Sequence, residues 1–284
     1  MGVKRPRDEM EGKEQDGSVQ RTSPFMSMFE TFRSELDEHH DRRERIIKAS
    51  RDITAASKKM SVPIFTLQRI RALNQPLPPH ATKSNKQYHD TIKTQFAAVS
   101  RDLQGLNTYR YSRQITGGCQ EWMEAASFQH YLETATLVTY EDASQVLRAL
   151  DENGPGIELS PEDYVLGIYD MTGELMRFAI TAMATSGELP KISNTQGDDM
   201  DVDGKATAQQ RSVLTDMREL RSGLEGLDAG FGPFAKDAEK KMEVMRQSVE
   251  KVERALYGLV VRGAERPKGW NPGVDAGRAV EVEG

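Results

Sequence analysis

Two pairs of acidic residues have the types and the spacing that could bind a metal ion. Glu121 and Glu124 are three positions apart within residues 115–137, ITGGCQEWMEAASFQHYLETATL, which have helical periodicity. Asp170 and Glu174 are four positions apart in another predicted helix. In each helix this spacing places both carboxylates on one face, beside the apolar stripe. Four carboxylates from two adjacent helices would form an oxygen-rich site for a hard divalent cation.

The same four carboxylates are also compatible with ordinary solvated charges, and their spacing alone does not separate the two interpretations. A ferritin-like di-iron site is a third alternative, which requires Glu-x-x-His motifs on two helices. Neither Glu121 nor Glu124 is followed by a histidine three positions later, and the second acidic helix contains none. The sequence therefore favours a divalent-cation site or solvated charges over a di-iron centre.

Composition limits the classes of protein that this chain can belong to. It has 284 residues and a formal charge of −6, so nucleic acid could bind only at a local basic patch. The single cysteine, Cys119, excludes an internal disulfide and is typical of a reducing compartment. The chain has no run of about 18 apolar residues and no apolar signal-peptide core, so we expect no membrane span. The expected location is the cytoplasm and the nucleus.

Polar segments predict the limits of one helical domain, residues 23–267. Residues 1–22 lack periodicity and are expected to form a disordered N-terminal tail. Within them, Lys4-Arg5-Pro6-Arg7 is either a nuclear localisation signal or a chance basic tetramer. Residues 186–206 are expected to form a flexible acidic loop, and residues 268–284 a loose C-terminal tail.

The remaining pattern predicts an all-α fold of about seven helices. Apolar residues recur at helical spacing, and no segment alternates convincingly as a strand. Pro63 is expected to kink or break the first helix. Ser160 followed by Pro161 is a strong helix start. The predicted helical segments are residues 25–60, 64–73, 82–103, 115–137, 141–150, 160–184, 213–227 and 234–259.

Aromatic and basic residues alternate immediately before the first acidic pair. In this segment Tyr109 and Tyr111 could stack on unpaired bases, while Arg110 and Arg113 hold phosphates. The alternative is a helix start with two core tyrosines. The first helix also has a basic face, which is either a surface for phosphates or a solvated face with helical ion pairs. That face consists of Arg42, Arg43, Arg45, Lys48, Arg51, Lys58 and Lys59.

Four blocks of sequence together resemble the translin family. They are RDITAASKKM, ITGGCQEWMEAASFQHYLE, SPEDYVLGIYDMTGELMRF and SVEKVERALYGLVVRGAERPK. The blocks occur in the family's order and lie between Phe25 and Lys268. The resemblance implies a translin-like antiparallel helical bundle and a hollow, barrel-like hetero-oligomer with translin.

The resemblance also implies an activity. It implies that this chain is the catalytic subunit of a metal-dependent endoribonuclease that cleaves single-stranded RNA. The implied substrates are small-RNA passenger strands or precursor-tRNA fragments. The acidic positions of the family correspond here to Glu121, Glu124, Asp170 and Glu174, which are the implied metal ligands. The first three are also the implied catalytic residues. The implied cofactor is Mg²⁺, with Mn²⁺ as the alternative, and single-stranded DNA is a second possible ligand. The alternative function is a non-catalytic scaffold that stabilises translin and binds single-stranded nucleic acid.

Overall fold

The computed structural model describes residues 25–66, 72–192 and 211–263. The predicted tails, residues 1–22 and 268–284, lie outside the described residues. So does most of the predicted acidic loop, from residue 193 onward. The candidate nuclear signal at Lys4 to Arg7 lies outside them as well.

The described residues form eight α-helices, so the predicted all-α class is confirmed. None of these helices has the length and hydropathy needed to span a membrane. The helices are α1 (Met26–Thr66), α2 (Pro79–Val99), α3 (Leu106–Arg110), α4 (Ser112–Thr134), α5 (Tyr140–Ala149), α6 (Pro161–Ser186), α7 (Val213–Glu225) and α8 (Pro233–Gly263), with a 3₁₀ helix η1 (Ser100–Leu103) after α2.

Two local predictions were wrong. Pro63 was predicted to kink or break the first helix, and it does not break it, because α1 continues to Thr66. Pro63 lies three residues before the end of α1, so few helical hydrogen bonds follow it. The segment predicted to be helical up to Leu73 instead ends in a two-residue strand, β1 (Ala72–Leu73). This strand pairs in parallel with β2 (Lys191–Ile192). Leu73 and Ile192 are both buried, so this short pairing serves to close the core.

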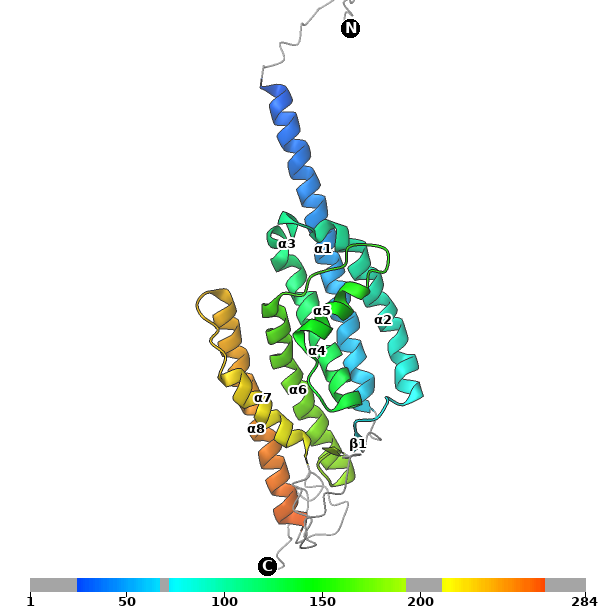
Figure 1. Ribbon diagram of the computed structural model, residues 1–284, viewed down its shortest axis with the longest axis vertical. Helices are drawn as coiled ribbons and strands as arrows, with labels where there is room; N and C mark the ends of the chain where they lie inside the picture. Colours follow the sequence, from blue (N-terminus) through cyan, green and yellow to red (C-terminus); the bar gives the residue numbers. More distant parts are fainter. Residues whose placement is uncertain (1–24, 67–71, 193–210, 264–284) are drawn as a thin grey trace, which may run out of the picture. The chain divides into compact units, whose positions relative to one another are not determined.

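Helix α6 lies at the centre of the bundle, between α4 and α8, and α7 packs against α8 (Figure 1). The predicted helix start is confirmed, since the Ser160 hydroxyl accepts a hydrogen bond from the Asp163 amide and Pro161 is the first helical residue. Gly187 ends α6 in the left-handed conformation, with φ of 70°. The buried apolar side chains of α6 include Leu166, Ile168, Met171, Leu175 and Phe178.

Helices α4 and α6 run in the same direction, although neighbouring helices of such a bundle are usually antiparallel. Near their starts, Thr116 on α4 contacts Asp163 on α6. Near their ends, the rings of Phe128 and Phe178 are 6.3 Å apart. Helix α5 and residues 151–159, which begin with a turn, return the chain between them. The parallel arrangement keeps a nearly constant offset, so residues about fifty positions apart lie at the same level.

Two glycines allow helices to approach α4 closely. A Cβ atom at Gly167 of α6 would lie 2.6 Å from Cβ of Met123. A Cβ atom at Gly118 would lie 3.2 Å from both Cα and the carbonyl oxygen of Ser50 on α1. The Gly118 amide also donates to the Ser50 hydroxyl, at 3.0 Å. Only glycine permits both contacts without displacement of a neighbour.

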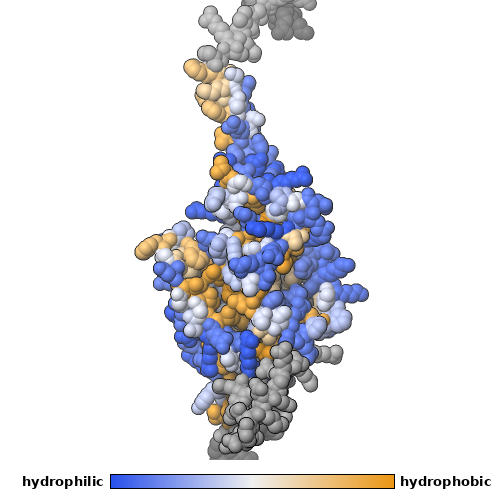
Figure 2. All heavy atoms as spheres, viewed as in Figure 1, coloured by the Kyte–Doolittle hydropathy of each residue, from blue (hydrophilic) through white to orange (hydrophobic). Residues whose placement is uncertain are grey.

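The chain divides into two compact units, Met1–Asp41 and Arg42–Gly284, so the boundary lies inside α1. The expected domain, residues 23–267, therefore spans both units. In the first unit, large apolar side chains of α1 are exposed, and Figure 2 shows them in orange at the N-terminal end of the helix. In the second unit, α1 buries Ile46 and Ile53 completely. The exposed residues of the first unit are Phe25, Met26, Met28, Phe29, Phe32 and Leu36.

Candidate metal centre

The parallel pairing of α4 and α6 brings the two acidic pairs to the same level. Glu121 and Glu124 lie on α4, and Asp170 and Glu174 lie 49 and 50 positions later on α6. All four side chains are shielded from solvent to some degree, and Glu174 is only 5% exposed. The predicted juxtaposition of four carboxylates on two helices is therefore present.

Glu124 carries the strongest electrostatic signal of the cluster. Burial, and then the charges of Glu121, Glu174 and Asp170, raise its pKa to about 8. A hydrogen bond between the carboxyl groups of Glu124 and Glu174 raises the pKa of Glu124 and opposes the rise at Glu174. The proton therefore belongs on Glu124, which donates to the Glu174 carboxylate. Burial also raises the pKa of Glu121, and the nearby Lys58 ammonium opposes that rise.

Three cationic side chains neutralise the other carboxylates. Lys58 of α1 lies 3.6 Å from Glu121, and Lys241 of α8 forms an ion pair with Asp170. Arg177, three residues after Glu174 on the same helix, pairs with that carboxylate. The Lys241 ammonium also lies 3.5 Å from the Gln120 side-chain oxygen and from the Leu166 carbonyl oxygen. Two of the three cations therefore come from helices other than α4 and α6.

The four carboxylates interact but do not converge on one point. Within the described residues, no group of three or more His, Cys, Asp or Glu side chains is placed to hold a metal ion. The cations explain this arrangement, because Lys58 and Lys241 draw Glu121 and Asp170 toward themselves. The chemistry of the donors still fits a hard divalent cation, since all four are carboxylates and their mutual repulsion favours a cation among them.

A fifth buried carboxylate, Asp163, lies between the same two helices and was missed by the sequence reasoning. Its carboxylate accepts hydrogen bonds from Thr116 and from the Gln120 amide, the latter at 2.9 Å. Burial raises its pKa, and the hydrogen bonds from Thr116 and Gln120 oppose the rise. The sequence did hold one signal for Asp163: it lies seven residues before Asp170, two turns along one face of the same helix.

The predicted RNA-contact residues separate into exposed and buried ones. Tyr109 is 84% exposed, and Arg110 and Arg113 are exposed as well. Tyr111 is only 3% exposed, so it is a core tyrosine and its ring is not available to a base. For Tyr111 the core alternative is the one that the structure supports.

The basic face of α1 is partly neutralised within the protein. The Nε atoms of Arg42 and Arg45 lie 3.2 and 3.0 Å from the Asp102 carboxylate. Lys58 is paired with Glu121, as described above. The face therefore includes helix-to-helix ion pairs as well as exposed charges.

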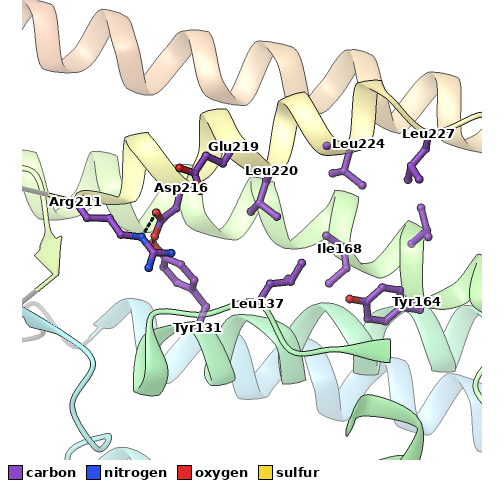
Figure 3. A pocket seen from close by; sticks show the side chains of 12 residues that line it. Tyr131, Leu137, Tyr164, Ile168, Arg211, Asp216, Glu219, Leu220, Leu224 and Leu227 are labelled. Carbon is purple, nitrogen blue, oxygen red and sulfur yellow. Dashed lines mark hydrogen bonds and ion pairs between the residues drawn. The ribbon is translucent and has the colours of Figure 1, made fainter. Parts of the chain in front are cut away.

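Figure 3 shows an apolar groove whose lining contains no residue of the acidic cluster. It encloses about 430 Å³ between α6, α7 and the segment after α4. Leu137, Ile168, Leu220 and Leu224 line it. At one end, Asp216 accepts hydrogen bonds from the Tyr131 hydroxyl and the Arg211 guanidinium, at 2.7 and 2.6 Å. None of the predicted metal or RNA-contact residues lines this groove.

Comparison with known proteins now identifies the family. Residues 41–263 match the model of the translin family. The chain belongs to the translin family. Over 276 residues it is 32% identical to translin-associated protein X of Rattus norvegicus, an alignment that covers 91% of this chain and 84% of the relative. It is also 32% identical to the translin-associated protein X homolog of Schizosaccharomyces pombe, over 84% of this chain and 89% of the relative.

Other translin-family and structural matches are more distant. The chain is 25% identical to translin of Homo sapiens over 80% of its length, which covers 89% of the human protein. Among solved structures, AfC3PO matches with a TM-score of 0.55 and 18% identity, covering 83% of this chain and 98% of that one. Apo-NeC3PO matches with a TM-score of 0.53 and 12% identity, over 80% and 96%. These two structures support the fold alone.

The translin-family match contains all four carboxylates and their three cationic partners. It begins at residue 41, next to the boundary between the two units. The exposed apolar segment of α1, residues 25–40, therefore precedes the residues that the family model matches.

Proposed function

We propose that this chain is the catalytic subunit of a metal-dependent endoribonuclease that assembles with translin and cleaves single-stranded RNA. The observation that carries the proposal is the shared environment of Glu121, Glu124, Asp170 and Glu174. The pKa values of Glu121, Glu124 and Glu174 are raised, and raised carboxylate pKa values in a cluster are typical of functional sites. Membership of the translin family and 32% identity to translin-associated protein X support translin as the partner. Small-RNA passenger strands and precursor-tRNA fragments are the proposed substrates.

The four carboxylates would hold Mg²⁺, or Mn²⁺, through their oxygen atoms. A bound divalent ion lowers the pKa of a coordinated water and stabilises charge on phosphoryl oxygens. The raised pKa of Glu124 favours a proton on its carboxyl group near pH 7, and a bound cation would favour release of that proton. Lys58 forms an ion pair with Glu121, and Lys241 forms one with Asp170. Both ion pairs would have to break for these carboxylates to bind a cation.

Exposed residues near the start of α4 are suited to hold RNA. Arg113 precedes Glu124 by eleven residues, or about three helical turns, so the two residues share a face of α4. Arg110 and Tyr109, on α3, offer a second cation and an exposed ring. Arginines would bind phosphates and Tyr109 would stack on a base, so binding would not depend on base identity.

The second candidate function is a non-catalytic scaffold that stabilises translin and binds single-stranded nucleic acid. The ion pairs favour it, because Lys58, Lys241 and Arg177 already neutralise three of the four carboxylates. Under this interpretation the cluster is a structural charge network. The two candidates make opposite predictions for cleavage.

The deciding experiment is cleavage of a labelled single-stranded RNA by the full chain co-expressed with translin. It would be run with Mg²⁺, with EDTA and with Asp170→Ala. Metal-dependent cleavage that Asp170→Ala abolishes, while RNA still binds, supports the nuclease. A matched control is Asp237→Ala, which removes an exposed carboxylate near the start of α8. RNA binding without cleavage in every condition would assign the chain to the scaffold class.

A further inference from the structure

Two lysines beside the candidate metal centre come from the helices that flank the α4–α6 pair (Figure 1). Helix α1 approaches α4 closely at Gly118, and α8 packs against α6. From α1, Lys58 reaches the carboxylate of Glu121. From α8, Lys241 reaches the carboxylate of Asp170. One ammonium group therefore lies beside the acidic pair of α4, and another lies beside the acidic pair of α6.

The ammonium group of Lys241 lies among three oxygen atoms. It forms an ion pair with Asp170, and it lies 3.5 Å from both the Gln120 side-chain oxygen and the Leu166 carbonyl oxygen. The side chain of Lys241 is 23% exposed, so the ammonium group is partly open to solvent. The two uncharged oxygen atoms would keep this group beside the cluster after its ion pair with Asp170 breaks.

Lys58 is held more loosely than Lys241. Its side chain is 65% exposed, and its nitrogen lies 3.6 Å from a carboxylate oxygen of Glu121, beyond the usual hydrogen-bond distance. A lysine ammonium has three donors at the end of a flexible four-carbon stem. Lys58 can therefore turn from Glu121 to another anion without any movement of α1.

The net charge of the cluster changes sign when a divalent cation is added. Counted as ionised groups, its four carboxylates carry −4, and Lys58, Lys241 and Arg177 carry +3. A divalent cation changes the total from −1 to +1. A proton on Glu124 would make the first total zero, and the charge would still rise. The loaded cluster therefore attracts an anion, and the anion of the proposed substrate is a phosphodiester.

We infer that Lys58 and Lys241 are positioning residues, which bind phosphates of single-stranded RNA once the carboxylates hold a divalent cation. Both ammonium groups leave their carboxylates when the site is loaded, and both then face the strand. Lysine suits this task because it binds phosphate as a point charge, whatever the base sequence. Tight RNA binding at the cluster therefore follows metal binding. The inference rests on the proposed function, because it requires a cation among the four carboxylates.

The test uses the full chain co-expressed with translin and measures two affinities. The first is the affinity for Mn²⁺ without RNA, by titration calorimetry. The second is the affinity for a single-stranded phosphorothioate RNA, which keeps the charge of each linkage and resists hydrolysis, with saturating Mn²⁺ and with EDTA. The variants are Lys58→Gln, Lys241→Gln, the double substitution and Lys58→Arg. Lys240→Gln is the matched control, because Lys240 is the exposed neighbour of Lys241 on α8.

The two affinities should change in opposite directions. The double glutamine substitution should raise Mn²⁺ affinity roughly tenfold, because two competing cations are gone, and lower RNA affinity with Mn²⁺ roughly tenfold. It should also reduce the slope of log affinity against log salt concentration by about 1.4, since each phosphate contact on a single strand contributes about 0.7. With EDTA the same substitution should change RNA affinity little. Lys58→Arg keeps the charge and should bind RNA normally, and Lys240→Gln should change neither affinity.

Three results would overturn the inference alone, if the wild type binds Mn²⁺ and cleaves RNA. One is unchanged RNA affinity of the double variant with Mn²⁺. Another is wild-type protein that binds RNA as tightly in EDTA as in Mn²⁺. The third is a decrease in both affinities, which would make the lysines structural supports of the cluster. Absence of Mn²⁺ binding by the wild type is a separate failure, because it would remove the proposed metal centre and the inference together.

Discussion

Asp163 and Glu124 are carboxylates in the same interface between α4 and α6, but their surroundings differ. Asp163 is surrounded by donors, since Thr116 and Gln120 both hydrogen-bond to it. Glu124 is surrounded by acceptors, since its nearest charged neighbours include Glu121, Asp170 and Glu174. Burial raises the pKa of both groups. Only at Asp163 do the neighbouring side chains oppose that rise.

This difference separates a structural carboxylate from a candidate functional one. A buried charge whose hydrogen bonds are complete holds two helices together. A buried group whose neighbours carry the same charge destabilises the fold, and such a cost is typical of a binding or catalytic site. Burial alone does not distinguish the two carboxylates, because it raises the pKa of both. The neighbouring groups distinguish them, since they are hydrogen-bond donors at Asp163 and like-charged carboxylates at Glu124.

The largest expected effect is on activity at Glu124. Glu124→Gln keeps a donor to Glu174 but removes an oxygen ligand, so cleavage should fall roughly a hundredfold, or about 2.7 kcal/mol in activation free energy. The same variant should raise the melting temperature of the metal-free protein, because burial and like charges no longer penalise this side chain. Cleavage assays and calorimetry measure the two effects. Glu133→Gln, farther along α4, is the control. A decrease in both the cleavage rate and the melting temperature of Glu124→Gln would contradict the functional role assigned to Glu124.

Gly167→Ala should have the next largest effect, on stability. The new Cβ would lie 2.6 Å from Met123, so α4 and α6 must separate, at a cost of about 1–3 kcal/mol in unfolding free energy. Gly173→Ala is a matched control on the same helix, because its nearest atom would be Arg177 Nη2 at 3.9 Å. That control should stabilise the helix by about 0.5–1 kcal/mol. Urea unfolding measures both, and equal effects would show that the interface tolerates separation.

Asp163→Ala should cost about 1–3 kcal/mol of unfolding free energy, because Thr116 and Gln120 lose their acceptor in a buried interface. Metal affinity, measured by Mn²⁺ titration, should remain unchanged. Glu162→Ala removes the exposed neighbouring carboxylate and should cost less. A loss of metal affinity in Asp163→Ala with unchanged stability would reverse the roles assigned to Asp163 and Glu124.

The smallest effect concerns pH at Asp102, a carboxylate paired with cations. Burial alone would raise its pKa, but hydrogen bonds from Arg45 and Arg42 outweigh burial and lower the pKa below 3.8. A lowered folded-state pKa contributes stability above the unfolded value, and this contribution is lost as pH falls below about 4. Asp102→Asn should therefore cost about 1 kcal/mol at pH 7 and progressively less as pH falls below about 4. A pH-independent difference in unfolding free energy would exclude this ion pair as its source.

The helices and the acidic pairs were predictable because they rest on local patterns. Ser160 and Pro161 marked the start of α6 correctly, and the three- and four-residue spacings placed each acidic pair on one face. The lysines that neutralise Glu121 and Asp170 were not predictable, since Lys58 and Lys241 come from α1 and α8. Contacts between distant segments leave no periodic signal.

Other errors have local physical reasons. Tyr109 lies in the last turn of α3, whereas Tyr111 is the single residue between α3 and α4, and the alternation of residue types does not show which of the two is buried. Asn85 did carry a signal, because it precedes Ile92 by seven residues and so shares the apolar face of α2. That spacing predicts the burial of Asn85, which is 4% exposed.

The parallel pairing of α4 and α6 has a consequence for the chain that joins them. Residues 152–155 lie in this connection, are exposed, and contribute no side chain to the metal centre. Loops of this kind tolerate insertions, because solvent accommodates the added residues. The connection is therefore a suitable place to insert a peptide tag or a fluorescent probe. Such an insertion would leave the acidic pairs of α4 and α6 in the same position relative to each other.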